Sequence, residues 1–137
     1  LSMIIRVFEV HILQSERRLA EAEAVAIMER RVALLPPAPA TETHGILAYA
    51  YARAGDLARA RETLARMRAA NGGTLPPTGV VAATTEILGD RDTAVALLAG
   101  AIAKHDGWID RYVRSERFDR LRKDPRAAAM LNKVGSW

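Results

Sequence analysis

The side chains best suited to acid–base or metal chemistry in this sequence are its three histidines, His11, His44 and His105. They lie far apart and fall on different predicted helices. None occurs in a His-x-x-x-His or His-Glu-x-x-His spacing, which would place two ligands on one face of a helix. Cysteine is absent, which excludes disulfides and cysteine metal sites. We therefore expect neither a metal site nor a cofactor, and we interpret His44 as a packing residue.

The usual arrangements of an enzyme active site are also missing. The glycine pair at 72–73 lacks the Lys-Ser/Thr that follows in a phosphate-binding loop. Acidic side chains stand mainly near arginines at helical spacing, as Glu62 does with Arg66 and Glu116 with Arg120. Such pairs are typical of a solvated helix surface. The serines show no nucleophile-elbow pattern (Ser2, Ser15, Ser115, Ser136). We expect no enzymatic activity.

The net charge of +4 is concentrated at the end of the chain. From residue 104 onward nine Lys/Arg stand against five Asp/Glu, so the first 103 residues are neutral overall. A basic segment of this kind can bind nucleic acid or an acidic partner, which is the alternative function. The interspersed acids favour a solvated helical surface instead. The cations concerned are Arg111, Arg114, Arg117, Arg120, Arg122, Lys123 and Arg126.

Length and composition indicate one all-α domain. The 137 residues are half apolar, rich in alanine and only 5% aromatic, which is typical of closely packed helices. The apolar start, 1–13, is interrupted by Arg6, Glu9 and His11, so we expect no signal peptide. No segment reaches the roughly 18 uninterrupted apolar residues of a transmembrane helix. We therefore expect a cytoplasmic protein without membrane contact.

Glycine and proline divide the chain into helical segments of about 12 to 15 residues. Between these breaks the apolar residues recur every three or four positions, as Leu57, Ala60, Leu64 and Met67 do. Short loops between such helices predict antiparallel neighbours. The breaks are Pro36–Pro39, Gly55-Asp56, Asn71–Gly73 with Pro76-Pro77, Gly89-Asp90, Asp106-Gly107 and Asp124-Pro125.

Two of these segments repeat each other. Gly55-Asp56 and Gly89-Asp90 are 34 residues apart, the period of tetratricopeptide (TPR) repeats. The pattern Leu47-Ala48-x-x-Tyr51, Gly55-Asp56, Ala60, Leu64 resembles the TPR consensus. The repeat departs from it at His44 and Met67, and the second copy departs at Thr78 and Thr85.

The resemblance implies a right-handed superhelical array of antiparallel helix hairpins, with about three repeats and a C-terminal capping helix. It divides the single domain, 1–137, into a degenerate first repeat (1–35), a second (41–72), a third (76–106) and a cap (107–137). Within 1–35, a hairpin turning near residues 14–17 and one long helix both remain open.

The tail carries a second resemblance. The run from Ser115 to Arg126 is similar to the segment that caps TPR regions in bacterial transcriptional regulators, adenylate cyclases and serine/threonine kinases. It keeps the Phe, the Leu-Arg and the Asp-Pro-Arg of that pattern but replaces its first proline by Glu116-Arg117. A repeat array needs such an element to cover its last apolar face. The residues expected to do so are Phe118, Leu121, Met130 and Leu131.

The function that this resemblance implies is binding of a protein or peptide in the concave groove lined by the first helix of each hairpin. An apolar groove around Tyr49 and Val80 would hold an extended or helical peptide. Packing of this face on another domain or a second copy stays open. The groove residues are mostly small or acidic, which does not support a carboxylate clamp. They are Glu42, Gly45, Tyr49, Ala52 and Arg53, then Pro76, Gly79, Val80, Ala83 and Glu86.

The beginning of the chain offers a second contact surface. Its apolar residues occupy nearly every face of a predicted helix, and such a helix is normally buried all round. In a three-hairpin array the first helix has only one neighbouring pair. We therefore expect homodimer formation, or packing on an upstream domain, through Ile4, Ile5, Phe8 and Ile12.

Overall fold

The computed structural model describes residues 20–34 and 42–134, and within them it is all-helical, without a β-strand. The all-α prediction is therefore confirmed. Residues 20–33 form a helix, which is followed by the labelled elements. These are α2 (Glu42–Arg53), α3 (Leu57–Ala70), α4 (Gly79–Ile87), α5 (Arg91–Ala103), α6 (Gly107–Tyr112), the 3-10 turns η1 (Glu116–Phe118) and η2 (Leu121–Lys123), and α7 (Pro125–Val134).

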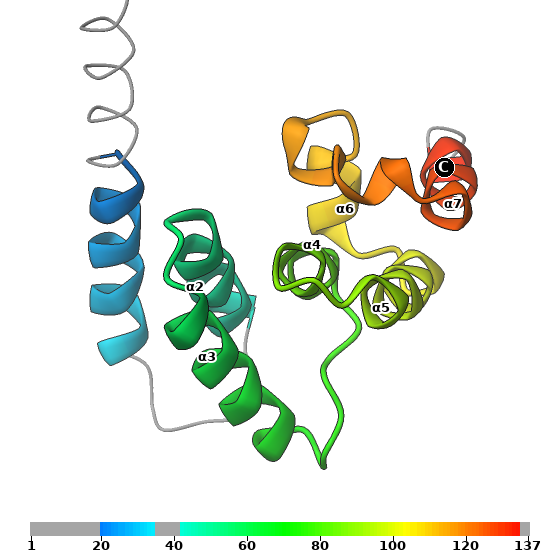
Figure 1. The fold of residues 1–137 in the computed structure, drawn as a ribbon. Coiled ribbons are helices and arrows are strands. Elements are labelled where there is room, and N and C mark those ends of the chain that lie inside the picture. The colour runs from blue at the N-terminus through cyan, green and yellow to red at the C-terminus, as the bar shows by residue number, and fades with distance from the viewer. Residues whose placement is uncertain (1–19, 35–41, 135–137) are drawn as a thin grey trace, which may run out of the picture.

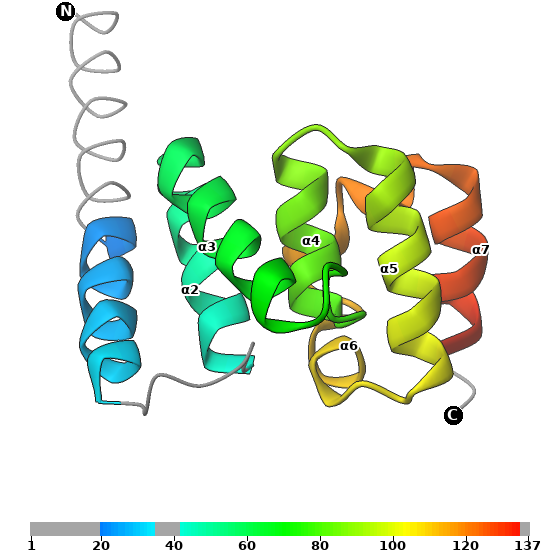
Figure 2. The ribbon, with the colours of Figure 1, turned by 90° about the horizontal axis from the view of Figure 1, so that it is seen from below.

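The helices pack in a row of antiparallel pairs. α2 packs on α3, α4 packs on α5, and α2 and α4 lie side by side in the middle of the row. The helix of residues 20–33 flanks the first pair, and α7 lies against α5 at the other end (Figure 1; Figure 2). Helix hairpins are therefore the building units, as the short predicted loops require.

The turn that closes each hairpin has the same backbone structure. Gly55 and Gly89 have φ of 86° and 92°, in the left-handed region that glycine adopts without steric cost. The next amide donates back into the helix in both turns, from Asp56 to Tyr51 O (2.9 Å) and from Asp90 to Thr85 O (3.2 Å). The turn structure thus recurs at the 34-residue spacing found in the sequence.

The aspartate of each turn also begins the following helix. The Asp56 carboxylate accepts a hydrogen bond from the Arg59 amide and the Asp90 carboxylate accepts one from the Thr93 amide, both at 3.2 Å. Such caps satisfy backbone donors that a helix leaves open at its N-terminus. The Gly-Asp pairs therefore end one helix and start the next.

Small side chains allow the helices to approach closely, which places the core at the helix crossings. Ala60 and Ala94 are completely buried at equivalent positions of the two hairpins. Gly45 lies where α2 crosses α4, since a Cβ there would stand 2.9 Å from Val80 Cγ1. α2 and α4 are thereby held in direct contact.

The helix of residues 20–33 packs on the outer side of the first hairpin. Its Met28 is buried in one cluster with Leu47 and Tyr51 of α2. Burial, and then the neighbouring Glu29 carboxylate, raise the pKa of the Tyr51 phenol. The turn predicted near residues 14–17, and the apolar residues Ile4, Ile5, Phe8 and Ile12, lie outside the described part of the chain.

The C-terminal segment divides into two parts with different tasks. α7 packs on α5, and its Leu131 is buried there. Phe118 and Leu121 of the 3-10 turns are buried in the same hydrophobic cluster. Phe118, Leu121 and Leu131 are therefore buried as expected for residues of the cap, whereas the fourth expected residue, Met130, is half-buried. Within the described residues, the cap expected over 107–137 consists of α6, η1 and η2 followed by the helix α7. α6 packs on α4, a helix expected to face the open groove.

None of the helices in the described ranges is long and apolar enough to cross a membrane.

Candidate functional site

A cluster of aromatic rings holds the C-terminal segment against the groove side of α2. The ring of Trp108 in α6 meets those of Tyr49, Tyr112 and Phe118 edge to face, with centroids 5.5, 5.0 and 5.4 Å apart. Edge-to-face pairs of this kind stabilise beyond the area they bury. Trp108 therefore connects α6 to α2 through Tyr49 and to η1 through Phe118.

α6 covers the first turn of α4 at Gly79. A Cβ at Gly79 would lie 2.5 Å from Ile109 Cγ1 and 3.1 Å from the Trp108 ring. The Gly79 amide donates to the Asp106 carboxylate over 2.7 Å, which ties the start of α4 to the start of α6. Gly79, expected in the groove, is therefore buried under the protein's own chain.

Two further residues that were expected to line the groove, Gly45 and Val80, lie inside the core. Gly45 is buried, and Val80 has 1% of its surface exposed, because the two pack against each other where α2 crosses α4. Neither can contact a ligand, so the apolar groove around Tyr49 and Val80 does not exist in that form. The side chain of Glu42 lies outside what the structure describes.

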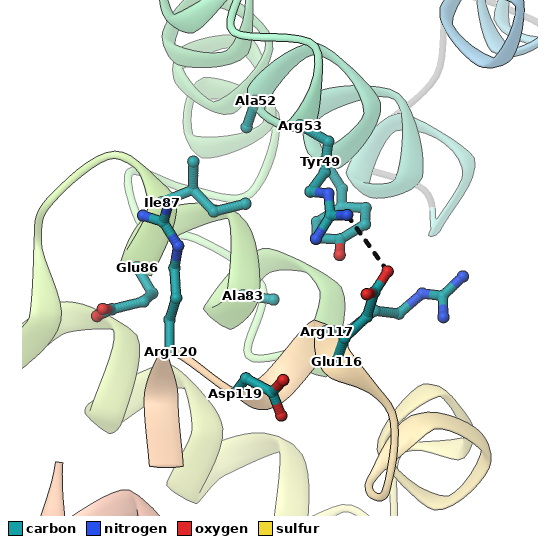
Figure 3. A pocket seen from close by; sticks show the side chains of 10 residues that line it. All are labelled: Tyr49, Ala52, Arg53, Ala83, Glu86, Ile87, Glu116, Arg117, Asp119 and Arg120. Carbon is teal, nitrogen blue, oxygen red and sulfur yellow. Dashed lines mark hydrogen bonds and ion pairs between the residues drawn. The ribbon is translucent and has the colours of Figure 1, made fainter. Parts of the chain in front are cut away.

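Residues near the ends of α2 and α4 form one wall of a pocket of about 280 Å³, in which Tyr49, Arg53 and Ile87 are half-buried. Of the predicted site residues it brings together Tyr49, Arg53, Ala83 and Glu86, with Ala52 beside them (Figure 3). The opposite wall comes from the C-terminal segment. The complete lining is Tyr49, Ala52, Arg53, Ala83, Glu86, Ile87, Glu116, Arg117, Asp119 and Arg120.

The second wall was missed by sequence reasoning. The sequence predicts residues 116–120 to be part of a basic tail and of the end cap. Their alternation of acids and arginines around the buried Phe118 is the pattern that could have shown a charged surface with one anchored side chain. No local pattern places that surface opposite α2, because the link is the contact of Trp108 with Tyr49.

Ion pairs fix several of the charged side chains around the pocket. Arg53 donates to Glu116 over 3.3 Å and so joins the two walls. This replaces the predicted pair of Glu116 with Arg120, whereas the Glu62–Arg66 pair is confirmed at 2.6 Å. With Glu116 bound to Arg53, Arg120 has no ion pair within the described residues. The pocket thus offers one uncommitted guanidinium.

Glu86 stands at the other side of the pocket with only 7% of its side chain exposed. Both of its carboxylate oxygens accept from Arg91, at 3.2 and 2.8 Å. A buried carboxylate needs such compensation. Glu86 therefore serves mainly to join α4 to α5, and only its edge contributes to the pocket.

Tyr49 lines the pocket and is half-buried. Burial raises the pKa of its phenol, and this effect is partly opposed by the nearby Arg53 and Arg117 guanidinium groups. The phenol is thus protonated at neutral pH and available as a hydrogen-bond donor. Arg117 itself stacks over the Tyr112 ring at 4.0 Å.

The arrangement is suited to binding. In the described ranges, no three metal-binding side chains come close enough together to hold an ion. The half-buried Ile87 and the small, largely buried Ala52 and Ala83 line the pocket together with Arg120 and Tyr49. Such a mixture accommodates a side chain with an apolar stem and a polar or anionic end.

Several arginines of the basic tail are engaged within the protein. Arg122 donates to Asp119 (3.4 Å) and to the Ser115 carbonyl (3.3 Å). Arg126 binds both Asp124 and Asp92 at 2.9 Å. Because the pairs with neighbouring acids offset their charge, the surface is less suited to a phosphate backbone than its composition indicated. Arg111, Arg114 and Lys123 are exposed.

Comparison with known proteins adds no identification: no family model, no curated protein and no solved structure matches this chain.

Proposed function

We propose that this chain is a non-catalytic module that binds a protein partner, and that it is the TPR region of a bacterial regulatory or signalling protein of the cytoplasm. The recurrence of the Gly-Asp turn and its aspartate cap after 34 residues supports the TPR part of the proposal. Hairpin arrays present the first helices of their repeats to ligands, and α2 and α4 occupy those positions.

The observation that carries the proposal is the pocket between α2, α4 and η1. It combines an exposed cation, a half-buried tyrosine and small apolar side chains, which are groups suited to the recognition of a peptide. Arg120 is the group free to bind a partner's carboxylate or carbonyl oxygen. The partner segment would lie along the last turns of α2 and α4, where Ala52 and Ala83 leave room.

Affinity capture with matched variants tests this function. The full chain is immobilised, and proteins retained from a bacterial lysate are compared for the wild type, Arg120→Glu and Arg114→Glu. The last two make the same charge change, but Arg114 is exposed outside the pocket. We expect a partner retained by the wild type and by Arg114→Glu and lost with Arg120→Glu. Equal retention by all three would exclude the pocket as the binding site.

A further inference from the structure

A second hollow lies between the two hairpins and shares no residue with the first pocket. Its volume is about 300 Å³. One side is α3, another is the turn between α4 and α5, and the loop that follows α3 closes it. The lining residues are Arg61, Leu64, Ala65, Arg68, Leu75, Thr85, Leu88, Asp90 and Thr93.

The floor of this hollow is apolar and preformed. Leu64 and Leu75 are exposed by only 7% and 9%, and Leu88 is half-buried beside them. The loop that carries Leu75 is fixed by its own hydrogen bonds. The Asn71 amide group donates to the Thr74 carbonyl (3.0 Å), and the Thr74 hydroxyl donates to the Asn71 carbonyl (3.3 Å). A ligand therefore meets a surface that needs little ordering.

Two cations, Arg61 and Arg68, stand at the rim of this hollow. Arg61 and Arg68 are exposed on α3, and neither side chain has an ion pair or hydrogen bond within the described parts of the chain. The other arginines of α3 differ, because Arg59 pairs with Asp56 (3.5 Å) and Arg66 with Glu62 (2.6 Å). The two arginines of α3 outside the hollow are therefore held in ion pairs, whereas the two at the rim of the hollow are available to a ligand.

The acid at the rim is already engaged. Asp90 accepts from the Thr93 amide as the cap of α5, and this hydrogen bonding is the main cause that lowers the pKa of its carboxyl. The charge of Arg68 contributes to that lowering, but no direct ion pair joins the two side chains in the described residues. The hollow therefore has an excess of positive charge above an apolar floor. Charge complementarity favours an anionic ligand, and the leucines favour one that also carries apolar side chains.

We propose that this hollow docks an acidic amphipathic helix of a partner protein, at a surface distinct from the pocket of the proposed function. Arg61 and Arg68 are seven positions apart, which is about 10.5 Å along a helix. In a partner helix that lies along α3, two carboxylates seven residues apart are separated by the same distance. Leucine-sized side chains between those carboxylates enter the hollow over Leu64, Leu75 and Leu88. A nucleic acid would use the two cations but leave this apolar floor exposed.

A defined peptide tests the proposal. The probe is a fluorescein-labelled, end-blocked helical peptide of about fifteen residues, long enough for partial helix formation. It carries two glutamates seven positions apart, two leucines midway between them and alanine or glutamine elsewhere. Binding to the full chain is followed by fluorescence anisotropy. Arg61→Gln with Arg68→Gln is expected to weaken binding at least tenfold, the effect of losing about 1.4 kcal/mol.

The matched control is the double variant Arg59→Gln with Arg66→Gln. It removes the same charge from the same helix but outside the hollow, and we expect binding within about twofold of wild type, since distant charges are largely screened. Replacing the peptide leucines by alanine is expected to weaken binding at least tenfold as well, since about 1.4 kcal/mol again corresponds to tenfold. Circular dichroism establishes that every variant is folded.

Three results would overturn the proposal: no saturable binding up to about 1 mM peptide, equal weakening by both double variants, or insensitivity to the peptide leucines. Displacement of the peptide by short duplex DNA, together with equal weakening, would indicate a general polyanion surface. Arg120→Glu is expected to leave peptide binding unchanged. Failure at this hollow is thereby distinguished from failure of the first pocket.

Discussion

Arg53 near the end of α2 donates a hydrogen bond to Glu116 in η1 over 3.3 Å, although 63 residues separate them in sequence. The bond connects the two walls of the candidate pocket (Figure 3). The Glu116 side chain is 71% exposed, so water and salt compete for it. The bond therefore orients the groups at the pocket mouth more than it stabilises the fold.

Glu116→Gln is expected to change the free energy of unfolding by less than about 0.5 kcal/mol, because exposed ion pairs contribute little. Urea denaturation at low and high salt measures this. The control is Glu62→Gln, which removes the exposed i,i+4 pair with Arg66 and should have an effect of similar size. A loss several times larger for Glu116→Gln than for Glu62→Gln would mean that the pair holds η1 in place.

The close contact of Gly79 with α6 predicts a large effect from one methyl group. In Gly79→Ala the new Cβ would meet Ile109 at 2.5 Å, so α6 must shift or deform. We expect a loss of about 1–3 kcal/mol, as for overpacked cores. Gly107→Ala, in the first turn of α6 with no atom within 4 Å of a Cβ, should be neutral or slightly stabilising. Thermal denaturation of both variants compares them, and equal stabilities would show that α6 adapts freely.

The helices and their ends could be predicted from the sequence because the information is local. Each Gly-Asp pair ends one helix by its positive φ and begins the next by its carboxylate, at both Gly55 and Gly89. Apolar spacing of three and four then identifies the buried faces, as Ala60 and Leu64 illustrate. These rules need no knowledge of the rest of the chain.

The site could be predicted only in part because its second wall depends on a distant contact. Tyr49 and Arg53 were found by their register on α2. Nothing local to Trp108 indicates that its ring packs on Tyr49, 59 positions earlier in the sequence. The same contact brings α6 over Gly79, which removed the expected groove and left the charged pocket in its place.

The left-handed turn at Gly89 predicts a specific pattern of substitutions. Its φ is 92° and no atom would lie within 4 Å of a Cβ, so a substitution tests backbone conformation alone. Gly89→Ala is expected to cost about 1–2 kcal/mol, the penalty of a side chain in that region. Gly89→Asn should cost less, because asparagine tolerates this conformation. Chemical denaturation gives the order of stability, and an alanine variant as stable as the wild type would contradict the left-handed conformation of the turn at Gly89.

Asp124 predicts how stability depends on pH at the acid end. The side-chain hydrogen bond from Arg126 is the main cause that lowers the pKa of its carboxyl from 3.8 to about 2. A group whose pKa is lowered by folding binds protons more readily in the unfolded state, so its contribution is complete above about pH 4. It is lost as the pH falls from about 4 to about 2.

Asp124→Asn retains an oxygen that can accept from the Arg126 backbone amide, as the carboxylate does at 2.8 Å, but removes the charge. Stability curves from pH 7 to pH 2 should therefore differ between wild type and variant above pH 4 and converge toward pH 2. Parallel curves would show that the Asp124 charge does not stabilise the fold.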